Sequence, residues 1–155
     1  MNPLLCGERL QMIYMQKDLA KKLESIAERF RVSEIYVFGS RASEIKARVG
    51  GESTTRQSSA DVDVGIQPAP GNRLSIDEKV DLAIALEDFF NVERVDLVVI
   101  PEADPFLAAD IIRGEILYCS DPDEQARTEL HVLRTAGDLA YYKRERIRSI
   151  LSGTA

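Results

Sequence analysis

The chain has 155 residues, of which 45% are hydrophobic and 30% charged, and its net charge at pH 7 is −6. This length and composition predict one globular domain, residues 1–155, with its own core. The acidic balance argues against a protein that coats DNA or RNA, which needs a positive field, but it leaves a nucleotide substrate open.

No segment resembles an export or membrane signal. The first residues carry no long apolar run behind a basic start, and the run VDLVVI at 95–100 is too short to cross a bilayer. Cys6 and Cys119 lie far apart without a metal-ligand pattern, which predicts reduced thiols. The single histidine, His131, cannot build a histidine-based metal site without partners. We therefore expect a cytoplasmic protein without membrane contact.

Apolar periodicity predicts alternating helices and strands in the first half of the chain. Residues 8–30 carry apolar residues at helical spacing, and residues 34–38 form the apolar run of a strand. A short helix over residues 41–49 follows. The small, polar segment 50–60 predicts a loop. Residues 61–67 then alternate between polar and apolar, which predicts a second strand.

The same alternation continues in the second half. A helix over residues 75–90 begins with Ser75 and Glu78, which have the spacing of a capping box. The other predicted elements of this part are a strand over 93–101, a short helix over 107–113 and an edge strand over 115–119.

A long helix over residues 122–151 ends the predicted order. Asp121 offers a capping side chain, and Pro122 suits the first helical position. Its length of about 45 Å exceeds what such a domain needs, so we expect it to bend near Gly137 or to meet another molecule. One seam of this helix has alternating spacings of three and four, with Arg144 in its gap, and consists of Leu130, Leu133, Gly137, Ala140, Ile147 and Leu151.

The end of this helix is basic. A solvated face that complements the helix dipole is the simplest interpretation, and docking of an acidic partner or of a phosphate is the alternative. We expect Tyr141 and Tyr142 to be packing residues. The cations concerned are Lys143, Arg144, Arg146 and Arg148.

Three carboxylates stand at the ends of predicted strands. Asp61 and Asp63 are two residues apart and point to one side of a strand, while Val62 points to the other. Adjacent acids repel each other, and a divalent cation between them removes that repulsion. Asp96 begins the next strand. If the two strands are neighbours, the three acids converge on one or two magnesium ions.

The turn after residues 34–38 supplies the complementary part of a site. Gly39 allows a phosphate to approach the backbone closely, and Ser40 offers a hydroxyl and an amide at a helix start. Arg41 adds what we expect to be a mobile positive charge. A phosphate-binding turn beside a carboxylate–metal cluster is the arrangement that in-line nucleotidyl transfer needs.

The motifs GSRA at 39–42, DVD at 61–63 and VDLV at 95–98 resemble those of the nucleotidyltransferase superfamily that includes DNA polymerase beta. Within it, the chain is similar to the minimal nucleotidyltransferase (MNT) proteins over roughly residues 20–120. The resemblance implies an α+β fold, a nucleotidyltransferase palm with a mixed β-sheet flanked by helices, plus the long C-terminal helix.

By the same resemblance, Asp61 and Asp63 are metal ligands, and Asp96 is a third ligand or the base. Gly39 and Ser40 hold the triphosphate. The cofactor is Mg²⁺, as two ions, and ATP is the substrate.

Many stand-alone MNT proteins act as antitoxins beside HEPN-type ribonuclease toxins and add AMP to a tyrosine of the toxin. The resemblance therefore implies protein adenylylation, with a HEPN-type toxin as partner. Two alternatives stay open: a non-catalytic antitoxin with a vestigial site, and nucleotidyl transfer to a small molecule. A dimer through the last helix is permitted.

The sequence departs from the family in two places. Residues 41–60 separate the Gly-Ser turn from the acid pair, a longer gap than is common. Ala60 precedes Asp61 where serine is usual, which is expected to loosen the hydrogen bonding of the turn. A longer surface loop costs little free energy. Neither change removes a predicted ligand.

Overall fold

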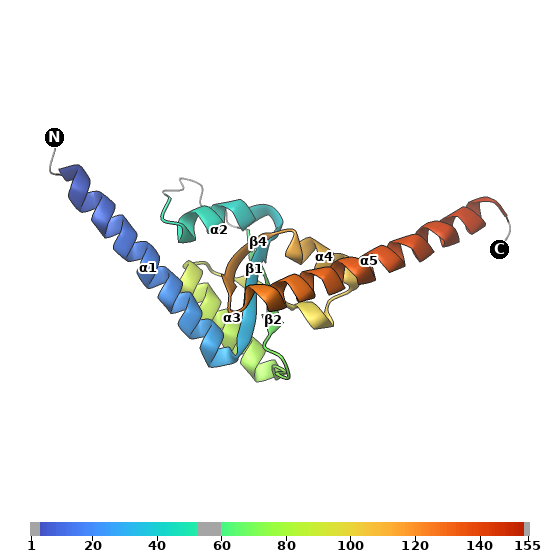
Figure 1. Ribbon diagram of the computed structural model, residues 1–155, viewed down its shortest axis with the longest axis horizontal. Helices are drawn as coiled ribbons and strands as arrows, with labels where there is room; N and C mark the ends of the chain where they lie inside the picture. The colour runs from blue at the N-terminus through green and yellow to red at the C-terminus, as the bar shows by residue number, and fades with distance from the viewer. Residues whose placement is uncertain (1–3, 53–59, 154–155) are drawn as a thin grey trace.

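The computed structural model describes the backbone of residues 4–52 and 60–153 and, from residue 17 onward, their side chains. Most of the loop predicted over residues 50–60 lies outside the described residues. Figure 1 shows helices on both faces of a small sheet, with α1 and α5 reaching away from it. In chain order the elements are α1 (Leu4–Phe30), β1 (Val32–Phe38), η1 (Gly39–Arg41), α2 (Ala42–Val49), β2 (Val62–Pro68), α3 (Ile76–Phe90), β3 (Val95–Val99), η2 (Ile100–Glu102), α4 (Pro105–Ile112), β4 (Glu115–Cys119) and α5 (Pro122–Leu151).

The sheet is mixed, as expected. Its strand order is β3-β2-β1-β4, so β4 is an edge strand, which confirms the prediction for residues 115–119. β1 pairs antiparallel with both β2 and β4. β2 and β3 run parallel, which requires a crossover connection, and α3 supplies it. This order places the predicted acid-bearing strands side by side.

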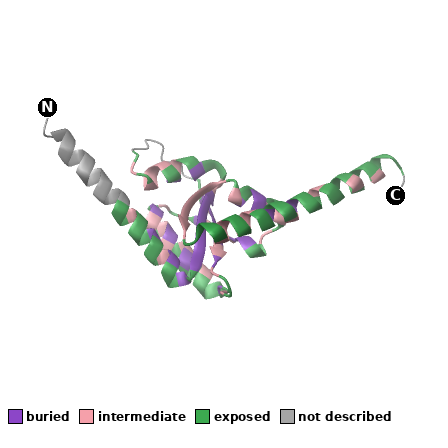
Figure 2. Ribbon diagram, viewed as in Figure 1, coloured by how far each residue is buried: buried purple, intermediate pink, exposed green. Residues whose placement is uncertain are grey.

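The two faces of the sheet bury separate apolar clusters. Ile35 and Val37 of β1 belong to the larger one, which packs against α1, α2 and α3. Tyr36 of the same strand points the other way and packs with residues of α4 and α5. Figure 2 shows the buried residues gathered around the strands, and the far part of α5 almost entirely exposed.

The helix ends follow their predicted capping residues. The Ser75 hydroxyl accepts from the Glu78 amide while the Glu78 carboxylate accepts from the Ser75 amide, so the capping box is confirmed. Asp121 caps α5 by accepting from the amide of Asp123. α5 is one continuous helix through Gly137, and Figure 1 draws it without a sharp bend, so of the two expectations for this helix the bend is not met. None of the described helices is both long and apolar enough to cross a membrane.

A buried polar cluster joins β1 to the first turns of α5. Glu34 has no solvent exposure, and the Tyr36 hydroxyl lies 3.0 Å from its Oε2 and 3.1 Å from Oε1 of Glu129. A hydroxyl carries one proton, so two full hydrogen bonds require one of the carboxyls to be protonated. Burial raises the pKa of Glu34, and the negative charges of Glu129 and Glu124 add to that shift. We assign the proton to Glu34.

Replacement of Glu34 by glutamine should therefore change how stability depends on pH. Because the folded-state pKa is raised above the ordinary 4.5, the wild type is fully stabilised below that pH and loses stability as pH rises through the raised pKa. That loss has a slope of up to ~1.4 kcal/mol per pH unit. Glu34→Gln cannot ionise, so urea denaturation should show its stability gaining on the wild type between pH 5 and pH 8. Parallel pH profiles would contradict this assignment.

Candidate active site

The ends of three neighbouring strands meet beside the turn that follows β1. In the register of the sheet, Asp63 of β2 lies between Asp96 of β3 and Phe38, the last residue of β1. Val62 and Val64 are fully buried on the face toward α1 and α3. Alternation along β2 therefore places Asp63 on the opposite face, toward α4 and α5. Asp63 and Asp96 are direct neighbours across the parallel pair.

Gly39 brings the turn into contact with this carboxylate. Its φ is +75°, a conformation that side chains with a Cβ rarely adopt, and a Cβ built there would overlap Oδ2 of Asp63. The absence of a side chain at residue 39 therefore has two structural reasons. Ser40 is exposed in the same turn, immediately before α2. The structure thus places the Gly39 backbone against the Asp63 carboxylate, with Ser40 beside Gly39 in the turn, and the role of these residues in holding a phosphate stays a prediction.

Gly39→Ala should weaken both the fold and the site. The left-handed backbone alone costs roughly 1–2 kcal/mol for an alanine, and the added methyl group must push the Asp63 carboxylate aside. Gly71→Ala is a matched control, because Gly71 has φ +77° and its added Cβ would meet no described atom within 4 Å. The unfolding temperature should fall in both variants, and further in Gly39→Ala because its added methyl group also meets Asp63. Binding of ATP, the substrate that the sequence predicts, should fall only for Gly39→Ala in calorimetry. Equal ATP affinity in the two would contradict the contact's importance.

The three carboxylates influence one another. Burial, then the charge of Asp96, then that of Asp61 raise the pKa of Asp63. The side chains of Asp61 and Asp96 are 43% and 45% exposed, so solvent screens part of their repulsion. The influence of Asp96 and Asp61 on the pKa of Asp63 agrees with the sequence prediction that the three acids gather at one end of the sheet. Their role as ligands stays a prediction.

Arg94, which the sequence analysis did not single out, connects two of these acids. Its Nη2 lies 3.0 Å from Asp96 Oδ1 and its Nε 3.6 Å from Asp61 Oδ2. The guanidinium thereby compensates part of the charge of the acids. Arg94 precedes Asp96 by two residues, and this period-two spacing was the available signal. Among the described residues, no three His, Cys, Asp or Glu side chains form a group that could hold a metal ion as they stand.

Arg41 differs from its prediction. It is only 5% exposed and is fixed rather than mobile: Nε and Nη2 donate to the Glu44 carboxylate at 3.0 and 2.9 Å, and Nη1 donates to the Ala60 carbonyl at 2.6 Å. Glu44 was also missed by the sequence analysis. The paired guanidinium lowers the pKa of Glu44. Arg41 therefore holds the backbone directly before Asp61, through a carbonyl contact that does not depend on the side chain at residue 60.

Other predicted features lie away from this site. His131 is exposed on α5, as expected, and Cys119 is a free, half-buried thiol. Tyr141 and Tyr142 are 60% and 68% exposed, so the prediction that they pack into the fold is wrong. Their rings contact each other instead, with centroids 5.8 Å apart.

Comparison with solved structures places this arrangement in a known fold. One similar chain comes from a complex of a tri-AMPylated Shewanella oneidensis HEPN toxin with its MNT antitoxin; identity is 16%, the TM-score is 0.60, and the match covers 88% of this chain and 99% of that one. A toxin–antitoxin complex with AMP-PNP contains another, at 16% identity and TM-score 0.62, with coverage of 85% and 98%. A third similar chain comes from the toxin–antitoxin MntA–HepT; its identity is 14%, the TM-score is 0.60, and the match covers 87% of this chain and 98% of that one.

A search of curated proteins finds no match. The structural similarities, all at low identity, establish a shared fold and confirm the predicted nucleotidyltransferase palm. A family model named Polymerase beta, Nucleotidyltransferase matches residues 21–123, a range that contains the Gly39 turn and all three aspartates. The chain therefore belongs to the polymerase beta nucleotidyltransferase family.

Proposed function

We propose that this protein is a magnesium-dependent nucleotidyltransferase that moves AMP from ATP to a tyrosine hydroxyl of a HEPN-type toxin and thereby acts as its antitoxin. The observation that carries the proposal is the alignment of Asp63 with Asp96 beside the Gly39 turn. The similar solved chains support the partner and the transferred group, since one of them accompanies an AMPylated HEPN toxin and another AMP-PNP.

The donor set fits magnesium in its chemistry. Asp61, Asp63 and Asp96 supply hard carboxylate oxygens. Burial first, and then the charges of Asp96 and Asp61, raise the pKa of Asp63, so a cation beside it would stabilise its ionised form. Arg94 pairs with Asp61 and Asp96. If these two carboxylates bind the ion, its charge takes the place of the guanidinium. Magnesium, when bound, would polarise the phosphates and stabilise the charge of the leaving pyrophosphate.

Residues of the chain would position the triphosphate and accept the proton of the tyrosine. The Gly39–Ser40 turn would accept the triphosphate, because its backbone has no side chain at residue 39 and a hydroxyl at residue 40. The tyrosine oxygen attacks the α-phosphorus in line, the bond to the bridging oxygen breaks, and pyrophosphate leaves. The phenolic proton passes to a carboxylate, for which we propose Asp96. Arg41, held by Glu44, keeps the entry to β2 in place.

Intact mass spectrometry of the partner tests this function. Incubation of the protein with ATP, magnesium and a cognate HEPN-type protein should add the mass of AMP to the partner. The double variant Asp61→Asn/Asp63→Asn should add none. No mass gain with the wild type, or an equal gain with the double variant, would sink the proposal.

A second candidate, a non-catalytic antitoxin, is favoured by one observation. The acids do not form a ready-made metal group among the described residues, and Arg94 already pairs with two of them. Titration calorimetry with ATP separates the candidates: magnesium-dependent binding supports the enzyme, and absence of binding with intact partner capture supports the contact mechanism.

A further inference from the structure

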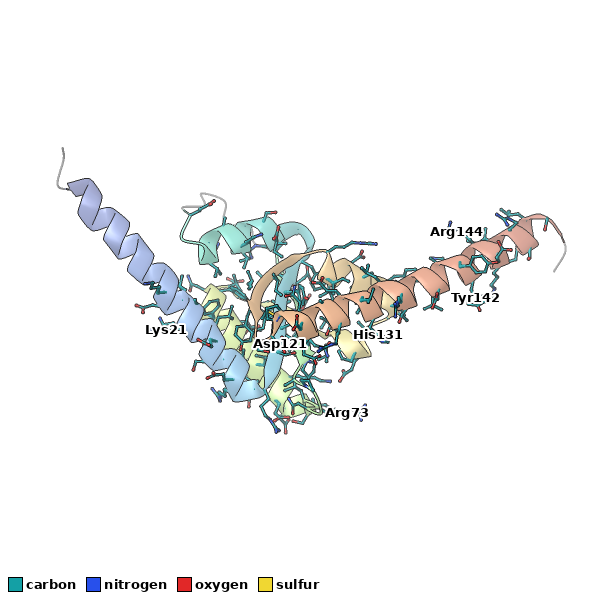
Figure 3. All side chains as sticks on the ribbon, in the orientation of Figure 1. Lys21, Arg73, Asp121, His131, Tyr142 and Arg144 are labelled. Carbon is teal, nitrogen blue, oxygen red and sulfur yellow. The ribbon has the colours of Figure 1, made fainter. Side chains whose placement is uncertain are left out.

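The fold buries no residue in the second half of α5. The buried residues of this 30-residue helix are Val132 and Ala136, both where it crosses α4. Beyond them α5 extends away from the sheet, and Tyr142 and Arg144 lie on this projecting part (Figures 1 and 3). Its residues are exposed or partly exposed up to Leu151, which is 82% exposed.

This projecting helix carries a regular apolar pattern on its open side. Residues at alternating spacings of three and four form one line along the helix, which we call the α5 seam. Its members are Leu130, Leu133, Gly137, Ala140, Arg144, Ile147 and Leu151. A spacing that averages 3.5 residues is that of the a and d positions of a coiled coil. The seam differs from the buried face, since Leu130, Leu133 and Ile147 are 50%, 45% and 47% exposed. The seam could therefore pack against a second helix, and none of the elements that the structure describes covers it.

The charges beside the seam decide which helix fits. In heptad terms Arg134 and Arg148 occupy e positions, Lys143 a g position, and Arg144 lies in the seam itself. The acidic residues of this stretch, Asp138 and Glu145, lie on the outer side. Pairing with a second copy of α5, parallel or antiparallel, would bring like charges together, which is unfavourable. A partner helix with acidic flanks would instead be attracted to Arg134, Lys143, Arg144 and Arg148.

Arg134, Arg144 and Arg148 are available for this role, whereas Lys143 lies over the Phe106 ring of α4, with Nζ 5.3 Å from the ring centroid. Arg134 and Arg144 take part in no ion pair among the described residues, and Arg148 makes only an exposed pair with Glu145, at 2.8 Å. Such exposed pairs contribute little and exchange easily. α5 leads away from the sheet, and Arg144 lies on its projecting part, away from the strands (Figures 1 and 3).

From this geometry we infer that the α5 seam docks an amphipathic helix with acidic flanks on the protein that receives AMP, an inference that rests on the proposed function for the partner's identity. The docked helix would hold the partner protein near the nucleotide site, while the helix itself would not contact that site. Specificity would come from apolar packing along the seam and from the charge at its borders.

Fluorescence anisotropy with designed peptides tests the docking. The probe is a labelled helix of three heptads with leucine at a and d and glutamate at e and g; its counterpart has lysine at e and g. The full chain should bind the acidic peptide and not the basic one. Leu133→Asp/Ile147→Asp should weaken binding about 30-fold or more, as hot-spot loss does. Tyr142→Ser, on the opposite side of α5, should leave binding unchanged, and circular dichroism checks that each variant is folded.

Charge reversal provides the second arm. Arg144→Glu/Arg148→Glu should reverse the preference toward the basic peptide, whereas Arg146→Glu, on the outer side, should not. Equal binding of both peptides, or binding that survives Leu133→Asp/Ile147→Asp, overturns the inference. Sedimentation that shows a dimer of the full chain, lost in the same double variant, also overturns it in favour of a second copy. Peptide binding by Asp61→Asn/Asp63→Asn must persist, so failed docking and failed AMP transfer stay distinguishable.

Discussion

On the proposed function, Asp63→Asn should sharply reduce AMP transfer while leaving the fold intact. The change keeps the shape of the side chain but removes the charge that lies beside Asp96 and against the Gly39 turn. A metal ligand contributes several kcal/mol of transition-state stabilisation, and each 1.36 kcal/mol is a factor of ten, so we expect a loss of about 1,000-fold. Single-turnover transfer of labelled AMP measures it.

The thermal stability of Asp63→Asn should not fall with its activity. In the wild type, burial and the charges of Asp96 and Asp61 raise the pKa of Asp63, which means that its ionised form is unfavourable without a metal. Asp63→Asn should therefore unfold at the same or a higher temperature in the presence of EDTA. Asp81→Asn, an exposed change on α3, is the control and should alter neither activity nor stability. Lower stability of Asp63→Asn would mean that Asp63 supports the fold rather than the chemistry.

Arg41→Ala should produce the largest loss of folding free energy. The side chains of Arg41 and Glu44 are only 6% and 13% exposed, and removal of one member of a buried pair leaves an uncompensated charge. We expect a destabilisation of about 3 kcal/mol, toward the lower end of that class, since Arg48 still pairs with Glu44. Urea denaturation measures the change.

An exposed pair of the same spacing isolates the effect of burial. Arg113 and Asp110 are also three residues apart in the chain, with N and O 3.6 Å apart and side chains 68% and 67% exposed. Arg113→Ala should change stability by less than about 0.5 kcal/mol. Arg41→Ala should additionally speed hydrogen exchange of the Val62 amide, because the Ala60 carbonyl loses its donor. Equal destabilisation by the two substitutions would show that the Arg41 pair is an ordinary surface contact.

Local chemistry explains which parts of the site were predictable from sequence. Strand alternation around Asp61 and Asp63 and the capping pattern at Ser75 depend on neighbours within a few residues, and both agree with the structure. Adjacency of Asp63 and Asp96 was conditional on strand order, which short-range patterns do not determine; the parallel pairing of β2 with β3 fulfils it.

Long-range partners explain what the sequence missed. The burial of Arg41 depends on the Ala60 carbonyl, nineteen residues away, so its fixed position has no local signature. The packing expected for Tyr141 and Tyr142 assumed that α5 ends against its own domain, whereas the helix continues past it. The described geometry of Arg94 likewise depends on two strands at once.

The bond between Arg41 and Ala60 has a consequence for how this family can diverge. The chain is anchored on both sides of residues 53–59: the Glu52 amide donates to the Ala47 carbonyl at 2.9 Å, and the Ala60 carbonyl is held by Arg41. Lengthening the chain between two fixed points costs free energy that grows only slowly with its length. The two anchors lie in the described chain, so a change of length between them need not disturb β2, provided that the arginine beside the glycine turn is kept.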